Sequence, residues 1–73
     1  MSQIQSVYFM TPEWTTKEAR AWLKKEHLVP IKRVHKVGHQ LRYRILEPIS
    51  NKYTTMMIHT STGRPIYFVL GID

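Results

Sequence analysis

Two arginines flank a tyrosine near the middle of this chain, in the sequence Arg42-Tyr43-Arg44. On a β-strand, residues two apart point to the same face and lie about 6.5–7 Å from each other. Two guanidinium groups at that spacing suit successive phosphates or an acidic protein groove. The alternative interpretation is a solvated strand face, whose arginines pair with Glu47 or Asp73.

Positive charge is concentrated around this motif. Residues 27–72 contain seven Lys or Arg and one acid, whereas residues 1–26 contain four bases and three acids. The formal net charge is +6, and such an excess attracts polyanions, most commonly nucleic acid. We therefore predict that DNA or RNA is held mainly through its phosphates, by five cations of a basic hairpin with two more at its margins: Lys32, Arg33, Lys36, Arg42, Arg44, Lys52 and Arg64.

Other chemistries find less support in the sequence. The chain has no cysteine, and its only neighbouring histidines, His35 and His39, flank a predicted turn. The five acids are scattered, and residues 61–64 (Ser-Thr-Gly-Arg) lack the glycine pattern of a phosphate-cradling loop. We therefore predict a protein without a metal, a cofactor or a catalytic site.

Eight aromatic side chains are available to form a core or to stack on nucleic-acid bases. In so short a chain most of them are needed for the core. Tyr53 and Tyr67, which adjoin predicted loops, are the best candidates for exposure.

The clearest local pattern predicts one helix, from about Thr16 to Glu26. Thr15 and Glu18 have the spacing of a capping box, and Trp14 and Ala19 have that of a hydrophobic staple. Apolar residues at 19, 22 and 23 then define one face, and a proline at position 30 prevents continuation.

Five strands are predicted around this helix. The ranges are 4–10, 31–37, 41–47, 53–59 and 66–70. The 41–47 strand alternates, with Leu41, Tyr43 and Ile45 on one face and the two arginines on the other. The 31–37 strand alternates poorly, which indicates a bulge or an edge strand. Pro48 should end the third strand, Ser50 and Asn51 should form a loop, and Gly71 should end the last strand.

The resulting order, β-α-β-β-β-β, predicts an α+β fold in which one helix packs on a mainly antiparallel sheet of four to five strands. The length predicts a single compact domain, residues 1–73. The other sheet face has no second helix to cover it, so it is either polar or covered by another chain.

Targeting features are not evident. The longest apolar runs, 66–70 and 7–10, are too short to span a membrane, and the first residues lack the pattern of a signal peptide. Together with the absence of cysteine, this predicts a soluble protein of a reducing interior, either a cell or a virion.

Several of these residues resemble those of a group of small proteins encoded by tailed phages and large DNA viruses. In that group a first strand leads to a helix with an Ala and a Trp-Leu pair, then to a strand with an Arg-aromatic-Arg centre, a proline, and an apolar strand near a glycine. The matching residues are Trp14, Ala19, Trp22, Leu23, Pro30, Ile31, Leu41 to Arg44, Pro48 and Phe68 to Gly71. The resemblance implies a viral or mobile-element origin, a compact α+β fold, and a location in the host cytoplasm or nucleus or in the virion.

Two functions are consistent with the sequence. The first is a small viral accessory protein that binds nucleic acid through phosphate contacts. The second is a protein-interaction module, either a virion component or an inhibitor of a host or competitor factor, with an acidic partner or a second copy of itself on the open sheet face. An edge strand such as 31–37 is a further surface for adding a partner's strand.

Overall fold

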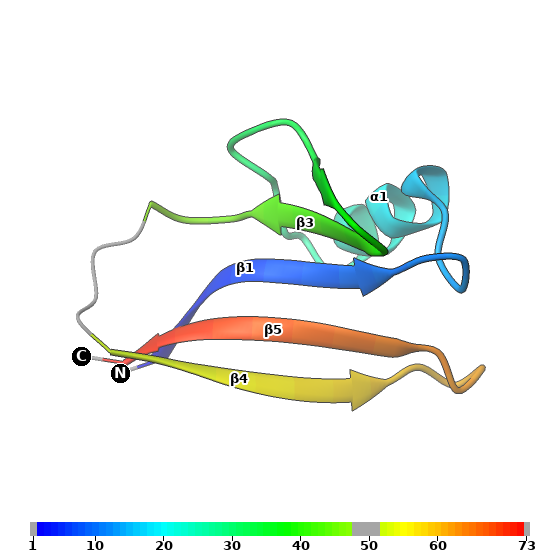
Figure 1. The fold of residues 1–73 in the computed structure, drawn as a ribbon. Helices are drawn as coiled ribbons and strands as arrows, with labels where there is room; N and C mark the ends of the chain where they lie inside the picture. The colour runs from blue at the N-terminus through cyan, green and yellow to red at the C-terminus, as the bar shows by residue number, and fades with distance from the viewer. Residues whose placement is uncertain (1, 48–51, 73) are drawn as a thin grey trace.

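A computed structural model describes residues 2–47 and 52–72 of the chain. It confirms the α+β class and the order of elements, which are β1 (Ser2–Met10), α1 (Thr16–Lys25), β2 (His35–Val37), β3 (Gln40–Arg44), β4 (Lys52–His59) and β5 (Pro65–Ile72). The strands form one antiparallel sheet in the spatial order β2-β3-β1-β5-β4 (Figure 1).

The helix begins where the capping box predicts. The Thr15 hydroxyl accepts a hydrogen bond from the Glu18 amide, and the Glu18 carboxylate accepts one from the Thr15 amide, each at 3.2 Å. Two backbone donors of the first turn are thereby satisfied. The helix ends at its C-cap, Glu26, and His27 follows with a φ of 60°.

The hydrophobic core lies between α1 and one face of the sheet. The Phe9 ring contacts those of Trp14, Trp22 and Tyr43 edge-on, with centroids 4.9, 5.9 and 5.7 Å away. The buried members of the core come from every part of the fold except β2 and β4: Val7, Phe9, Trp14, Ala19, Leu23, Leu41, Tyr43, Ile45, Ile66 and Phe68.

Burial alternates along β3 and β5, as it does on strands with one covered face. Leu41 and Tyr43 point toward α1, so Arg42 and Arg44 point to the opposite side of the sheet, as predicted. We call this uncovered side the open face.

The predicted third strand is three residues too long at its C-terminal end. The pairing of β1 shifts register between Ile4 and Ser6, and the amides of Ile45 and Leu46 both donate to the Gln5 carbonyl, at 2.7 and 3.1 Å. One acceptor serving two successive donors interrupts the regular ladder. The strand therefore ends at Arg44, although Ile45 is still buried.

The predicted second strand is also too long, because only His35–Val37 pairs with β3. The Ile31 amide donates to the Arg44 carbonyl at 2.9 Å, but this single bond does not extend into a ladder. Residues 31–34 are therefore irregular, and β2 is a short edge strand. Gly71, expected to end the last strand, lies within β5, which continues to Ile72. The predicted break at Pro48 and loop at Ser50 and Asn51 fall outside the described residues.

The helix covers only part of the sheet. In Figure 1, α1 lies near β1 and β3, whereas β4 forms the opposite edge. Seven of the eight residues of β4 are exposed, so this strand is uncovered on both faces. Within residues 2–47 and 52–72, no helix is both long and apolar enough to cross a bilayer.

Candidate nucleic-acid interface

A row of side chains crosses the open face perpendicular to the strands. The register places Tyr8 of β1 directly between Arg42 of β3 and Tyr67 of β5. His35 of β2 lies beyond Arg42, and Met57 of β4 lies beyond Tyr67. We call these five residues the cross-strand row. With strands about 4.8 Å apart, the row is roughly 19 Å long.

Arg42 is oriented by its neighbour in this row. Its guanidinium carbon lies 4.6 Å from the centroid of the Tyr8 ring, and its Nη2 donates to the Tyr8 hydroxyl. An arginine has five N–H donors, so one bond of this kind leaves most of them available to an anion. The ring fixes the side chain on the open face without neutralising its charge.

Arg44 belongs to the next row of the open face, opposite Ser6. Its Nη1 lies 3.9 Å from a carboxylate oxygen of Glu47, whose other oxygen is 3.9 Å from the Lys32 ammonium. Both pairs are long and exposed, and pairs of this kind contribute at most about 1 kcal/mol. The alternative interpretation, in which Glu47 or Asp73 pairs with the arginines, therefore applies weakly to Arg44 through Glu47, and Asp73 falls outside the described residues.

Three tyrosines share the open face. Tyr8 and Tyr67 are half-buried neighbours within the cross-strand row. Tyr53 lies on β4 opposite Gly71 and is 43% exposed. The expected exposure of Tyr53 is confirmed, and Tyr67 is partly exposed, whereas Tyr43 belongs to the core.

The remaining predicted cations do not lie beside these arginines. Lys36 is paired with Leu41, which places it on the helix side of the sheet. Lys52 also lies on the helix side, at the start of β4 opposite Ile72. Lys32 and Arg33 belong to the irregular segment 31–34 and line a hollow beside α1. The basic hairpin is thus divided between two surfaces. Strand alternation turns Lys36 away from Arg42 and Arg44, and residues 31–34 do not continue the β2–β3 ladder.

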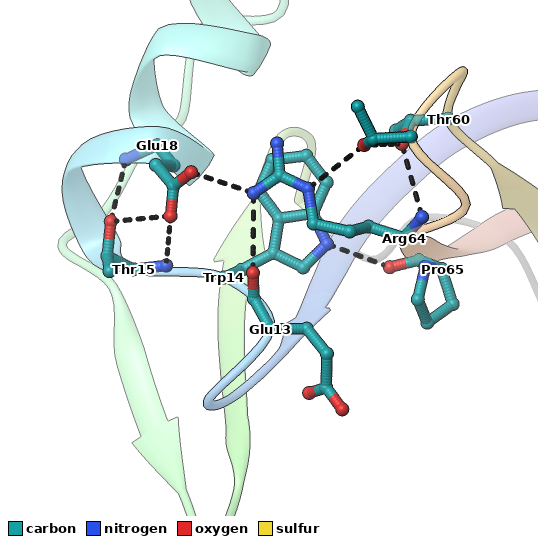
Figure 2. A network of polar contacts seen from close by, with 8 residues as sticks. Glu13, Trp14, Thr15, Glu18, Thr60, Arg64 and Pro65 are labelled. Carbon is teal, nitrogen blue, oxygen red and sulfur yellow. Dashed lines mark hydrogen bonds and ion pairs between the residues drawn. The ribbon is translucent and has the colours of Figure 1, made fainter.

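Arg64, the last predicted contact, is held in an intramolecular network (Figure 2). Its Nη1 is 2.8 Å from a carboxylate oxygen of Glu18 and also donates to the Glu13 carbonyl at 3.3 Å. Its guanidinium carbon lies 3.9 Å above the centroid of the Trp14 ring. We therefore leave Arg64 out of the proposed interface, because its charge already has a partner.

The same network joins the 60–65 turn to the beginning of α1. The indole Nε1 of Trp14 donates to the Pro65 carbonyl at 3.0 Å, and the Arg64 amide donates to the Thr60 hydroxyl at 3.3 Å (Figure 2). Arg64 and Glu18 are 46 residues apart, so sequence spacing gave no indication of this pair.

Sequence reasoning also missed Tyr8 as an open-face residue. The signal was present, because Val7 and Phe9 are the apolar members of an alternating strand and Tyr8 lies between them. What the sequence lacked was the register that sets Tyr8 beside Arg42.

Within the part of the chain that the structure describes, no three His, Asp or Glu side chains gather as a metal site would require. No family model, curated protein or solved structure matches this chain.

The Arg64–Glu18 pair predicts a pH-dependent contribution to stability. The hydrogen bond from Arg64, followed by those from Thr15, lowers the pKa of Glu18 in the folded protein. A lowered pKa stabilises the fold above the pKa of the unfolded chain and loses that effect as the pH falls. Replacing Arg64 by Gln should therefore lower the melting temperature at about pH 7 and lower it less at about pH 3.

Thermal unfolding followed by circular dichroism tests this prediction, with Arg33→Gln as a control that removes the same charge outside the network. A loss of stability in Arg64→Gln that is independent of pH would mean that Arg64 acts through the Trp14 ring and not through Glu18.

Proposed function

We propose that this protein binds nucleic acid on its open face and has no catalytic activity. The observation that carries the proposal is the juxtaposition of Arg42 and Arg44 with Tyr8 and Tyr67 on one uncovered sheet surface. Among the described residues, Arg42 forms no salt bridge, and the only one of Arg44 is the 3.9 Å contact with Glu47. Cations beside aromatic rings are the combination that single-stranded nucleic acid requires.

Phosphate contacts supply most of the affinity in this proposal. A net charge of +6 attracts a polyanion from a distance, and each arginine that contacts a phosphate releases a bound counterion. α1, the one helix of the described residues, is committed to the core through Leu23 and Ala19 and is not available to read a groove. We therefore propose binding without strong sequence specificity.

The first test reverses the charge of the open face. The double variant Arg42→Glu and Arg44→Glu should bind a 12-nucleotide single strand at least about tenfold more weakly, a loss of about 1.4 kcal/mol. The slope of log K against log salt should fall in magnitude by about 1.4, because each phosphate contact contributes about 0.7 on single strands. Fluorescence anisotropy at several salt concentrations measures both quantities.

Its matched control is Lys17→Glu with Lys25→Glu, which makes the same change in net charge on the exposed surface of α1. Equal weakening by both double variants would show that the net charge binds the strand and that the open face does not.

The second test concerns the tyrosines. Tyr67→Ala should weaken binding of a single strand by about 1–3 kcal/mol, because stacking of one base on an aromatic ring is worth that much. Tyr67→Phe keeps the ring and should bind as the parent protein does. An abasic 12-mer, which has the same sugar-phosphate backbone without bases, should bind to Tyr67→Ala, to Tyr67→Phe and to the parent protein with the same affinity. Loss of binding to this abasic strand in Tyr67→Ala would contradict stacking.

A second function, association with another copy of the chain, is favoured by β4. This strand pairs only with β5 among the described strands, and Met56 and Met57 are 46% and 48% exposed on its two faces. Its six central residues, 53–58, carry no charge. Natural proteins usually protect such an edge with charges, proline or a covering element.

Two copies of β4 can pair with each other antiparallel around a two-fold axis. If the axis passes through Met56, the two Lys52 side chains are eight residues apart, or about 27 Å. That is several times the screening length of about 8 Å at physiological salt. The positive charge of the protein therefore does not prevent this pairing. It would place both open faces on the same side of one continuous sheet.

Light scattering after size exclusion tests the pairing. The parent protein should have twice the mass of one chain at high concentration, and Met56→Lys should shift it to a monomer. Val29→Lys, which adds the same charge at an exposed apolar position away from β4, should leave the dimer intact. A monomeric parent protein, or a dimer unaffected by Met56→Lys, would exclude β4 as the interface.

The viral origin and the location in a host cell or virion remain proposals that depend on the resemblance of residues 14–71.

An acidic protein partner is the alternative to nucleic acid as the ligand of the open-face arginines. A pull-down from lysate with and without nuclease distinguishes nucleic acid from an acidic protein as the partner, because an association mediated by nucleic acid is lost on nuclease treatment.

A further inference from the structure

A hollow of about 920 Å³ opens on the helix side of the molecule, away from the open face. Its walls are α1 and the irregular segment that follows it, residues 28–34, and Tyr43 of β3 also lines it. The sequence indicated no such site, because residues 31–34 were expected to lie in the sheet.

Four cations line this hollow. Arg20 and Lys24 come from α1, and Lys32 and Arg33 come from the segment opposite. None of the described residues that line it is acidic. Lys32 reaches Glu47 at 3.9 Å, but this exposed pair neutralises little of its charge. The hollow is therefore a concentrated positive field with low-dielectric walls on one side, a combination that attracts anions.

The Tyr43 hydroxyl is a second, independent indication of a ligand. Tyr43 is 2% exposed, and its hydroxyl oxygen is buried without a hydrogen-bond partner among the described residues. Most buried polar groups have a partner, and one without calls for an explanation. Burial raises the pKa of Tyr43, although the charge of Arg20 opposes the shift. The hydroxyl thus keeps its proton at neutral pH and has a hydrogen bond to donate to a group that reaches it.

The remaining lining is apolar apart from Thr16. Val29 is 75% exposed and Ile31 is 48% exposed, and Leu28, Pro30 and Val34 complete this wall. Exposed apolar side chains beside a cationic wall suit a ligand that has both an apolar part and an anionic part. The volume lies within the range of about 300–1,000 Å³ that is usual for small-molecule sites.

We infer that this hollow binds a phosphorylated small molecule of the nucleoside phosphate class. The phosphates would lie among Arg20, Lys24 and Arg33 and accept a hydrogen bond from Tyr43, and the base would pack on Val29 and Ile31. A polyphosphate places several negative charges within a few ångströms, so one ligand can contact several of these cations. An acidic peptide strand spreads its charges about 6.5–7 Å apart on one face. The site goes beyond the proposed function and does not depend on it.

Isothermal titration with three probes tests the ligand class: ATP without magnesium, adenosine and inorganic pyrophosphate. ATP should bind to one site per chain, and at least about tenfold more tightly than either fragment, because only ATP uses both the cations and the apolar lining. Absence of saturable ATP binding at millimolar concentration would overturn the inference. Equal affinity for ATP and pyrophosphate would also overturn it, since that result describes a general anion site.

Variants test the residues. Arg20→Gln with Arg33→Gln should weaken ATP about tenfold or more, whereas Lys25→Gln with Lys52→Gln, which removes the same charge elsewhere, should change the affinity by less than about twofold. Tyr43→Phe should weaken ATP about tenfold while leaving the ligand-free protein as stable as before or more stable, because it removes a hydroxyl without a partner. An unchanged ATP affinity in Tyr43→Phe would show that the Tyr43 hydroxyl does not contact the ligand.

Amide chemical shifts locate the ligand and separate this inference from the proposed function. ATP should shift the amides of α1 and of residues 28–34, and a single-stranded oligonucleotide should shift those of β1, β3 and β5. Arg42→Glu with Arg44→Glu should leave ATP binding intact. Shifts by ATP that are confined to the open face would overturn the site in the hollow.

Discussion

The described part of the chain depends on one constraint, which is that a single helix must cover a five-stranded sheet. A helix of ten residues is about 15 Å long and 10–12 Å wide with its side chains. Five strands at about 4.8 Å spacing form a sheet roughly 19 Å wide. The helix can therefore close a core over β1, β3 and part of β5, but it leaves β4 and the whole opposite face uncovered. The open face and the exposed β4 both arise from that mismatch in size.

Within the covered region the packing is centred on aromatic rings. Phe9 is fully buried and contacts three other rings, two of them from tryptophans that flank or belong to α1. Arg64 then stacks on the outer face of Trp14 and pairs with Glu18, so the cap of the helix, the core and the β4–β5 turn form one unit. The net charge of the chain is therefore larger than the charge available to a ligand, because Arg64 is paired with Glu18.

Short-range patterns in the sequence predicted most of the fold. The capping box placed the start of the helix, and the alternation of Leu41, Tyr43 and Ile45 placed both arginines on the correct face. Those patterns depend only on backbone periodicity. Where a strand ends depends on partners elsewhere in the chain, and the shared Gln5 carbonyl shortened β3 in a way that no local pattern encodes. Pairing with distant residues also decides where residues 31–34 lie. Local patterns therefore did not predict that Lys32 and Arg33 lie on a different surface from Arg42 and Arg44.

The position of β1 has a consequence for how the chain acquires its structure during synthesis. This first strand lies between β3 and β5 and forms its longest pairing with the strand that is made last. Contacts of such high sequence separation carry a large loop-closure cost and slow folding. One of the two hydrogen-bonding edges of β1 must wait until the ribosome has translated residues 65–72. Until then the nascent chain exposes an apolar strand that chaperones or other emerging chains can bind.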